Sequence, residues 1–295
     1  MPLTTNLPAP SASEPATRWQ AISPAMATAL RDARLQLHHA AQLAPAAGIS
    51  YLRAEADDSH TNLEWIASLA VLASRELPTK PAVRVAIRPR DLTVMLLEGG
   101  AQVASLALHG VTMERAGRWL SEALAEHGLD PRRFTLKRHF VIPTHPVGDG
   151  APFDTSTTQP FAEIARWFAN ADEVLRSLAA EIDGATPVRC WPHHFDIATL
   201  IALPPAAGTA SRAIGVGLEP GDRYYEQPYW YVNPKPQPAA KGLPTLEGGG
   251  HWHTEDWIGA VLPGDRLSFD AGEQQRQTID FLRSAIDSCR HLLGA

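Results

Sequence analysis

Helical and strand-like hydrophobic patterns follow one another in the same order twice along this 295-residue chain. Residues 18–142 and residues 160–295 each contain a helical pattern, several strand patterns and a final helical pattern. Strands that follow one another without intervening helices pair as antiparallel neighbours. We therefore predict an α+β fold in which antiparallel sheets pack against helices, with two similar halves joined by the Pro- and Gly-rich residues 143–159.

The first half begins with a helical pattern at Ser23, which can cap a helix. Pro45 and Gly48 are expected to end that helix. Residues 49–77 contain both a strand alternation at 63–71 and helical spacings, and we interpret the alternation as a strand. The other strand patterns of this half cover residues 83–88, 92–98, 102–108 and 134–142, and its second helical pattern covers residues 112–127.

The second half contains a short sequence echo of the first. His60 and Asn62 precede Leu63 in the same way that His194 and Asp196 precede an aliphatic residue. An internal duplication and a chance likeness both account for so few matching positions. The strand patterns of this half cover residues 188–203, 213–218, 229–232 and 257–262, and its helical patterns cover 161–182 and 273–293.

Composition limits the class of protein and its partners. The net charge of −6, with scattered arginines, argues against a nucleic-acid-binding surface. The Pro-, Ala-, Ser- and Thr-rich residues 1–17 are expected to form a disordered tail before a single domain at 18–295. No segment approaches the ~20 apolar residues that cross a bilayer. Cys190 and Cys289 suggest no disulfide framework, so we expect a cytoplasmic protein.

Aromatic and polar residues concentrate between residues 190 and 257. This stretch holds four of the twelve histidines, four of the five tyrosines and half of the eight tryptophans. Rings with polar tips are typical of a pocket that holds a polar ligand between apolar walls. We expect a small-molecule pocket with these walls: Trp191, Tyr229, Tyr231 and Trp252.

Three motifs in this stretch resemble a known family. They are Trp-Pro-His-His-Phe-Asp-Ile-Ala at 191–198, Gly-Val-Gly-Leu-Glu-Pro-Gly-Asp at 215–222 and Pro-Tyr-Trp-Tyr-Val at 228–232. Their order is similar to that of a bacterial family of α+β proteins of unknown function. The resemblance implies a fold and no activity.

Two histidine motifs suggest a metal site. Residues two apart on a strand share a face, so His194 lies beside Asp196, and His251 beside His253. If the two strands are neighbours, these four side chains form a ligand set for a divalent transition metal such as zinc, iron, nickel or manganese. The metal would activate a water, and Glu255 would transfer protons as the catalytic residue of a metal-dependent enzyme.

A non-catalytic function is the alternative. The same histidines and aromatic residues can satisfy one another in the buried polar network of a structural or interaction protein. Residues 233–250, rich in Pro and Gly, are either a lid over the pocket or a surface loop. The sequence leaves open which function applies and whether any reaction is catalysed.

Overall fold

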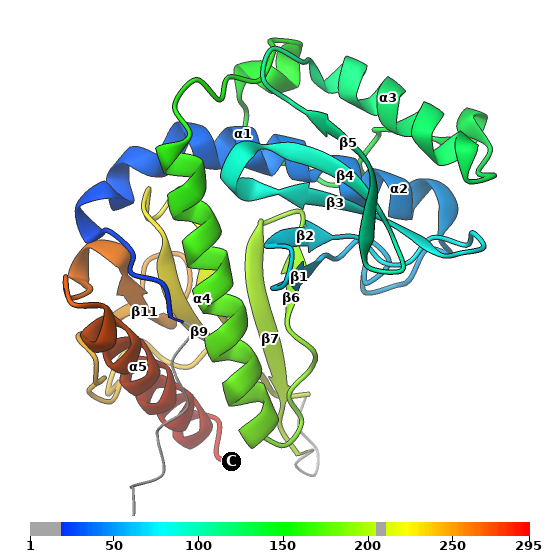
Figure 1. Cartoon of the computed structure of the whole chain (residues 1–295). Coiled ribbons are helices and arrows are strands. Elements are labelled where there is room, and N and C mark those ends of the chain that lie inside the picture. Colours follow the sequence, from blue (N-terminus) through cyan, green and yellow to red (C-terminus); the bar gives the residue numbers. More distant parts are fainter. Residues whose placement is uncertain (1–18, 205–210) are drawn as a thin grey trace, which may run out of the picture.

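The computed structural model describes residues 19–204 and 211–295 and confirms the predicted α+β class. A five-stranded and a six-stranded antiparallel sheet pack against helices (Figure 1). The predicted tail at 1–17 lies outside the described residues. The proposal of two similar halves stays a prediction, although both sheets are antiparallel and both follow and precede helices.

The first sheet is a meander in which each strand pairs with the next along the chain. Gly99 and Gly100, both with positive φ, form its last turn, a conformation that glycine adopts without strain. Helices α2 and α3 cover one face. The strands are β1 (Glu64–Ile66), β2 (Val71–Ala73), β3 (Val83–Arg88), β4 (Thr93–Glu98) and β5 (Ala101–Ala107), and the helices are α2 (Leu43–Tyr51) and α3 (Met113–Glu126).

The second sheet has the strand order β10-β11-β9-β8-β7-β6. Helix α4 packs on β7 and β8, and helix α5 packs on β8, β9 and β11, so both helices cover the same face. The strands are β6 (Arg189–Trp191), β7 (Asp196–Ala202), β8 (Ala213–Glu219), β9 (Tyr229–Lys235), β10 (His251–His253) and β11 (Gly259–Pro263), and the helices are α4 (Gln159–Glu181) and α5 (Ala271–Leu292).

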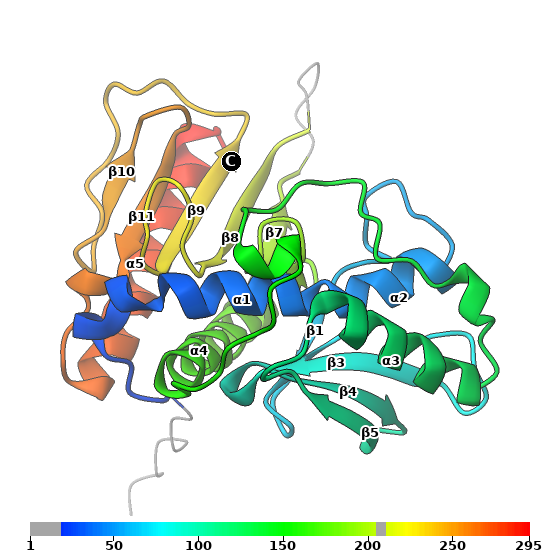
Figure 2. The ribbon, with the colours of Figure 1, turned by 90° about the horizontal axis from the view of Figure 1, so that it is seen from above.

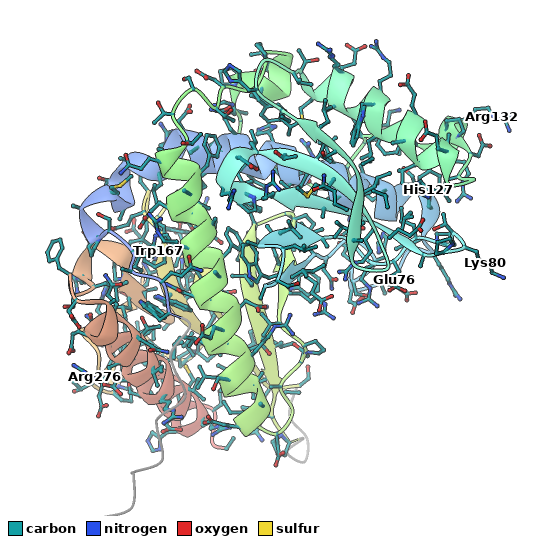
Figure 3. All side chains as sticks on the ribbon, in the orientation of Figure 1. Glu76, Lys80, His127, Arg132, Trp167 and Arg276 are labelled. Atoms are coloured by element: carbon teal, nitrogen blue, oxygen red, sulfur yellow. The ribbon has the colours of Figure 1, made fainter. Side chains whose placement is uncertain are left out.

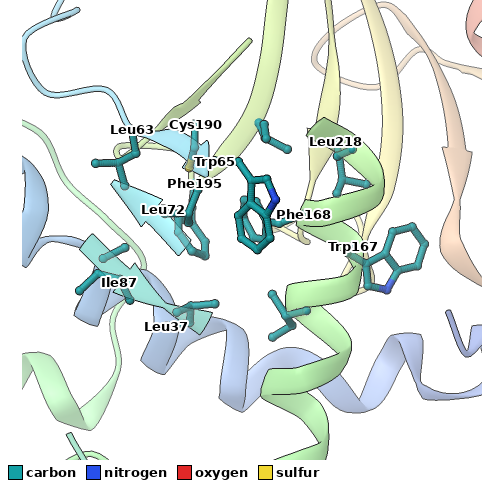
Figure 4. Close-up of a cluster of buried hydrophobic side chains, with 14 of the residues drawn as sticks. Leu37, Leu63, Trp65, Leu72, Ile87, Trp167, Phe168, Cys190, Phe195 and Leu218 are labelled. Atoms are coloured by element: carbon teal, nitrogen blue, oxygen red, sulfur yellow. The ribbon is translucent and has the colours of Figure 1, made fainter. Parts of the chain in front are cut away.

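The two sheets meet at their edge strands. Leu63, immediately before β1, and Cys190, in β6, exchange two backbone hydrogen bonds of 2.9 and 2.8 Å. On the helix side of this junction, Phe168 of α4 lies 6.3 Å from the Trp65 ring and 5.2 Å from the Phe195 ring (Figure 4). A shared apolar core therefore joins the halves.

The first predicted helix continues further than its sequence indicates. A 3₁₀ helix (Pro24–Leu30) leads into α1 (Arg31–Ala41), and α2 then runs through Pro45 and Gly48. The prediction that these two residues end the helix is wrong because Pro45 lies in the first turn of α2, where its missing N–H has no intrahelical acceptor. Gly48 is needed for packing, since a Cβ there would lie 2.4 Å from the His60 carbonyl oxygen.

Two predicted strands are interrupted by turns. The alternation at 63–71 divides into β1 and the start of β2, with Ala70 at a φ of 52° between them. The run at 188–203 divides into β6 and β7, and Phe195 turns the chain at a φ of 72°. Periodicity alone does not reveal such turns, because the buried residues on both sides keep an apolar pattern.

The predicted strand at 134–142 is absent from the described residues, which are irregular there. Thr135 donates its backbone N–H to the Ser50 hydroxyl, and Leu136 packs against Gly117 of α3. The segment therefore bonds to helices instead of the edge of a sheet, and a strand requires a paired neighbour.

The sequence echo falls at different places in the two sheets. Residues 60–63 precede the first strand of one sheet, whereas residues 194–197 enter the second strand of the other. Element order is thus the remaining basis for the predicted duplication.

Most charged side chains lie on the outside of the molecule and most large apolar side chains lie inside it. Figure 3 shows Lys80, Arg132 and Arg276 at the periphery, whereas Trp167 lies between elements.

Candidate functional site

The site lies on the face of the second sheet that α4 and α5 leave uncovered. Along β9, Trp230 and Val232 enter the core, whereas Tyr229 and Tyr231 point to the opposite face. The same alternation divides β7 and β8. A cavity of about 440 Å³ occupies this face, within the usual size range of small-molecule sites.

Gly217 allows Tyr231 to reach across the sheet. Tyr231 lies opposite Gly217, which in turn lies opposite Ala198. The tyrosine ring crosses β8 at the glycine, and its hydroxyl donates a 2.5 Å hydrogen bond to Oδ2 of Asp196 on β7. A Cβ at residue 217 would lie 2.7 Å from that hydroxyl oxygen, so the contact depends on glycine.

Two buried carboxyl groups form the floor of the cavity. The pairing of Ile197 with Leu218 places Asp196 opposite Glu219, where cross-strand Cβ atoms are ~5 Å apart. Their exposed fractions are 8% and 6%. Burial raises the pKa of Asp196, against the effect of the Tyr231 hydrogen bond. Burial raises the pKa of Glu219 well above its usual range, and the nearby charge of Asp196 raises it further.

The second oxygen of Asp196 has no protein partner. Oδ1 is buried and accepts no hydrogen bond within the described residues. A buried polar atom without a partner costs free energy, which a bound ligand or a proton on the neighbouring carboxyl group can recover. Within the same described residues, Asn233 Oδ1, on β9, is a second buried oxygen of this lining without a partner, and Asp196 is the carboxyl group of the lining that has one.

Asp222, in contrast, has hydrogen-bond donors for both of its carboxylate oxygens within or near its own turn. Its Oδ1 accepts backbone hydrogen bonds from Tyr224 at 2.7 Å and from Tyr225 at 2.9 Å. Its Oδ2 accepts a 2.9 Å hydrogen bond from the Tyr229 hydroxyl. The Pro-Gly-Asp turn recognised in the sequence thus positions a tyrosine of the cavity wall.

Helix α1 fixes the turn between β6 and β7, which carries His193 and His194. The Pro192 carbonyl accepts hydrogen bonds from His38 at 2.8 Å and from Gln42 at 3.0 Å. Burial lowers the pKa of His38 to about 3, so its ring is neutral and its Nε2–H donates. In Figure 2, α1 crosses the end of the second sheet near β8 and β9.

A second cavity adjoins the first beside α1. The two cavities share five lining residues, which are His193, His194, Glu219, Asp222 and Tyr224. Burial, together with the neighbouring His194, lowers the pKa of His193 to about 4, so His193 is neutral at pH 7. Arg34, almost fully buried, donates to the Gly221 carbonyl behind this second cavity.

The structure does not assemble the predicted metal ligands. His251 and His253 share a face of β10, as predicted, but β11, β9 and β8 separate that strand from Asp196 on β7. Four inter-strand steps of ~4.8 Å amount to ~19 Å. His194 lies in the turn before β7 instead of on an extended strand. Within residues 19–204 and 211–295, no three His, Cys, Asp or Glu side chains are grouped to hold a metal ion.

The β10 histidines belong instead to a hydrogen-bonded chain. His253 Nε2 donates to the Glu255 carbonyl at 2.6 Å, so its Nδ1 accepts from the Tyr225 hydroxyl at 3.1 Å. That hydroxyl accepts from His251 Nε2 at 3.3 Å, and Arg266 donates to His251 Nδ1 at 3.3 Å. Both nitrogens of both rings are occupied. The Glu255 side chain is exposed and outside the cavity lining.

Three of the four predicted aromatic walls line the cavity. Trp191, Tyr229 and Tyr231 do so, whereas Trp252 points to the other face of β10, packs against the core and donates its indole N–H to the Pro244 carbonyl at 2.7 Å. Since His251 and His253 face the open side, alternation requires Trp252 to face the helices. Glu219 was missed because only the β7–β8 register places it beside Asp196.

The predicted lid packs partly against α5. Gly248 has a φ of 63°, and a Cβ there would lie 2.3 Å from the Gln277 carbonyl oxygen of that helix. A Cβ at Gly250 would likewise meet the Phe281 ring at 2.3 Å. The glycines therefore serve close packing at the C-terminal end of this segment.

Comparisons of the chain with protein-family models, curated proteins and solved structures give no match. The resemblance to a bacterial family of unknown function therefore stays a prediction.

Among the described helices, none combines the length and the apolar character needed to cross a membrane. The cysteines, Cys190 and Cys289, are both buried and free.

Proposed function

We propose that the chain binds a small polar organic molecule in the cavity on the open face of the second sheet. The observation that carries this proposal is Asp196, which is more than nine-tenths buried, lines the cavity and retains an oxygen without a hydrogen-bond partner. Native structures seldom leave such an atom unsatisfied away from functional sites.

The shape of the sheet face supports the same function. Ala198 on β7 and Gly215 on β8 leave space in the cavity, while Tyr229, Tyr231 and Trp191 supply rings around it. Apolar walls with a few polar groups are the usual composition of ligand sites. The predicted metal ligands do not form part of this proposal, because three strands separate His251 and His253 from Asp196.

A non-catalytic structural function is the second candidate, and one observation favours it. The chain from Arg266 through His251, Tyr225 and His253 to Glu255 pairs each donor with an acceptor. Such a network can stabilise β10 without contacting any ligand. We assign this function to β10 and the binding function to β7, β8 and β9.

Thermal unfolding in the presence of a library of small polar compounds tests the binding function. Leu200→Trp should narrow the cavity, which Leu200 lines, while Val103→Trp on β5 is a matched control at a similarly exposed strand position. A ligand at 100 times its Kd stabilises the fold by ~2.7 kcal/mol. Shifts should be lost in Leu200→Trp and kept in Val103→Trp. Shifts of equal size in both variants, or no shift in the unmodified chain, would contradict the proposal.

A further inference from the structure

Building on the proposed binding function, we infer that the ligand is an organic cation whose charged group binds at the Asp196–Glu219 pair. The cavity holds three carboxyl groups, from Asp196, Glu219 and Asp222. Among the described residues that line it, Lys235 alone is a permanent cation, and its side chain is exposed at the end of β9. The lining is therefore acidic and attracts positive charge.

The rings around the cavity favour the same class of ligand. Trp191, Tyr224, Tyr229, Tyr231 and Trp257 all contribute to the lining. The face of an aromatic ring carries negative charge density, so a cation within ~6 Å of several rings is stabilised by each. An organic ammonium group uses both the rings and the carboxyl groups, whereas an anion is repelled by both.

The three carboxyl groups of the cavity differ in how many of their oxygens already have hydrogen-bond partners. Both oxygens of Asp222 are engaged by Tyr224, Tyr225 and Tyr229. Asp196 has one engaged oxygen and one unpartnered oxygen, and Glu219 lies opposite it on β8. Of the three carboxyl groups, the Asp196–Glu219 pair is thus the one to which a bound cation can supply a missing partner.

Proton release should accompany binding. Tyr231, His194 and Lys235 stabilise the charged form of Asp196, as Arg34 does for Glu219, while the charges of Asp196 and Asp222 disfavour the charged form of Glu219. Burial raises the pKa values of both carboxyl groups, and the nearby charge of Asp196 raises that of Glu219 further, which favours a proton on the empty pair. A cation that enters replaces this positive charge, and the proton passes to solvent, so the charge of the pair and its occupant is conserved.

Calorimetry at pH 7 with matched probes tests the inference. Tetramethylammonium, benzylammonium and cyclohexylammonium are compared with tert-butanol, benzyl alcohol and cyclohexanol, each in two buffers of different ionisation enthalpy. At least one cation should bind about tenfold or more tightly than its alcohol, as expected for a charge-assisted contact, and should release protons. Glu219→Gln and Asp196→Asn should each abolish the preference and the proton release, while Glu122→Gln, an exposed substitution on α3, should change neither.

The outcomes separate this inference from the proposed function. If the alcohols bind as tightly as the cations, without proton release, and Leu200→Trp removes this binding, the cation inference is wrong and the binding function stands. The same conclusion follows if no cation binds but other library compounds raise the melting temperature and Leu200→Trp removes that increase. If nothing binds, both are wrong. Melting temperatures of the two carboxyl variants verify folding, and either folded variant is sufficient for the test.

Discussion

The two sheets have the same antiparallel character but differ on the faces that lie away from their main helices. In the first sheet this face carries a buried apolar cluster, whose members are Val71, Ala73, Ala86, Met95 and Leu97. In the second sheet the corresponding face carries two carboxyl groups, two tyrosines and a cavity. Topology therefore does not determine which sheet can bind a ligand. The side chains at alternate strand positions determine it.

Side-chain size explains how the two faces diverge. Met95 and Leu97 fill the space above β4 in the first sheet. In the second sheet, Ala198 and Gly217 occupy adjacent positions on β7 and β8, and Tyr231 lies across them instead of standing upright. Small residues thus create the cavity, and a long side chain with a polar tip crosses its floor.

The largest effect should come from removing apolar volume in the first sheet. Leu97, which is buried, leaves a void when changed to alanine, and Leu97→Ala should lower the free energy of unfolding by about 2–5 kcal/mol. Urea unfolding measures this change. Binding of cavity ligands should remain in the folded fraction, and Val103→Ala on the exposed face of β5 should cost under about 0.5 kcal/mol. Loss of binding in folded Leu97→Ala would contradict the separation of the two faces.

A smaller effect should come from adding volume in the second sheet. Gly217→Ala places a methyl group against the Tyr231 hydroxyl and the Ala198 side chain, so overpacking should cost about 1–3 kcal/mol. Ala107→Gly at an exposed position of β5 in the first sheet should cost ~1 kcal/mol or less. Chemical unfolding of both variants gives the comparison. Equal costs would show that the glycine is not required for the tyrosine crossing.

Removing one hydroxyl from the second sheet should cost less again. Tyr231→Phe leaves Asp196 without its 2.5 Å hydrogen bond, and we expect a loss of about 1–2 kcal/mol in the free energy of unfolding. The pKa of Asp196 should also rise, because this hydrogen bond opposes the effect of burial. NMR titration of the aspartate carboxyl carbon measures the change. Tyr225→Phe, which affects the β10 chain, should leave that titration unaltered.

The smallest effect should be seen in the pH dependence of stability. The folded pKa of Glu219 is raised above 4.5, so its contribution to stability is present below about pH 4.5 and is lost as pH rises towards the folded value. Glu219→Gln removes that contribution, and its free energy of unfolding should fall less between pH 5 and pH 8 than that of the unmodified chain. Urea titrations at the two pH values provide the measurement. Parallel declines would show that Glu219 titrates as an exposed group.

Local periodicity was sufficient to predict the fold class and most of its elements. The predicted strands at 83–88 and 213–218 and the predicted helix at 112–127 correspond closely to the structure. Each depends on residues that are neighbours in sequence. The turns within 63–71 and 188–203 were not predicted, because the apolar pattern continues through both of them.

The candidate site was predicted only in part for a related reason. Tyr229 and Tyr231 share a face because alternation is local, but the opposition of Asp196 and Glu219 depends on the register between β7 and β8. The order of β9, β11 and β10 likewise determines the distance that separates the histidines from Asp196. One error was avoidable: alternation within β10 already excludes Trp252 from the face that holds His251 and His253.

The contact between Leu63 and Cys190 also bears on solubility. A strand edge with free backbone groups can recruit strands from other molecules, and the two sheets meet at edges that would otherwise be open. Cleaving the chain within 143–159 and separating the fragments would leave one such edge on each. Each half therefore covers a strand edge of the other that could otherwise pair with another molecule. Co-expressed fragments should give more soluble protein than either fragment expressed alone.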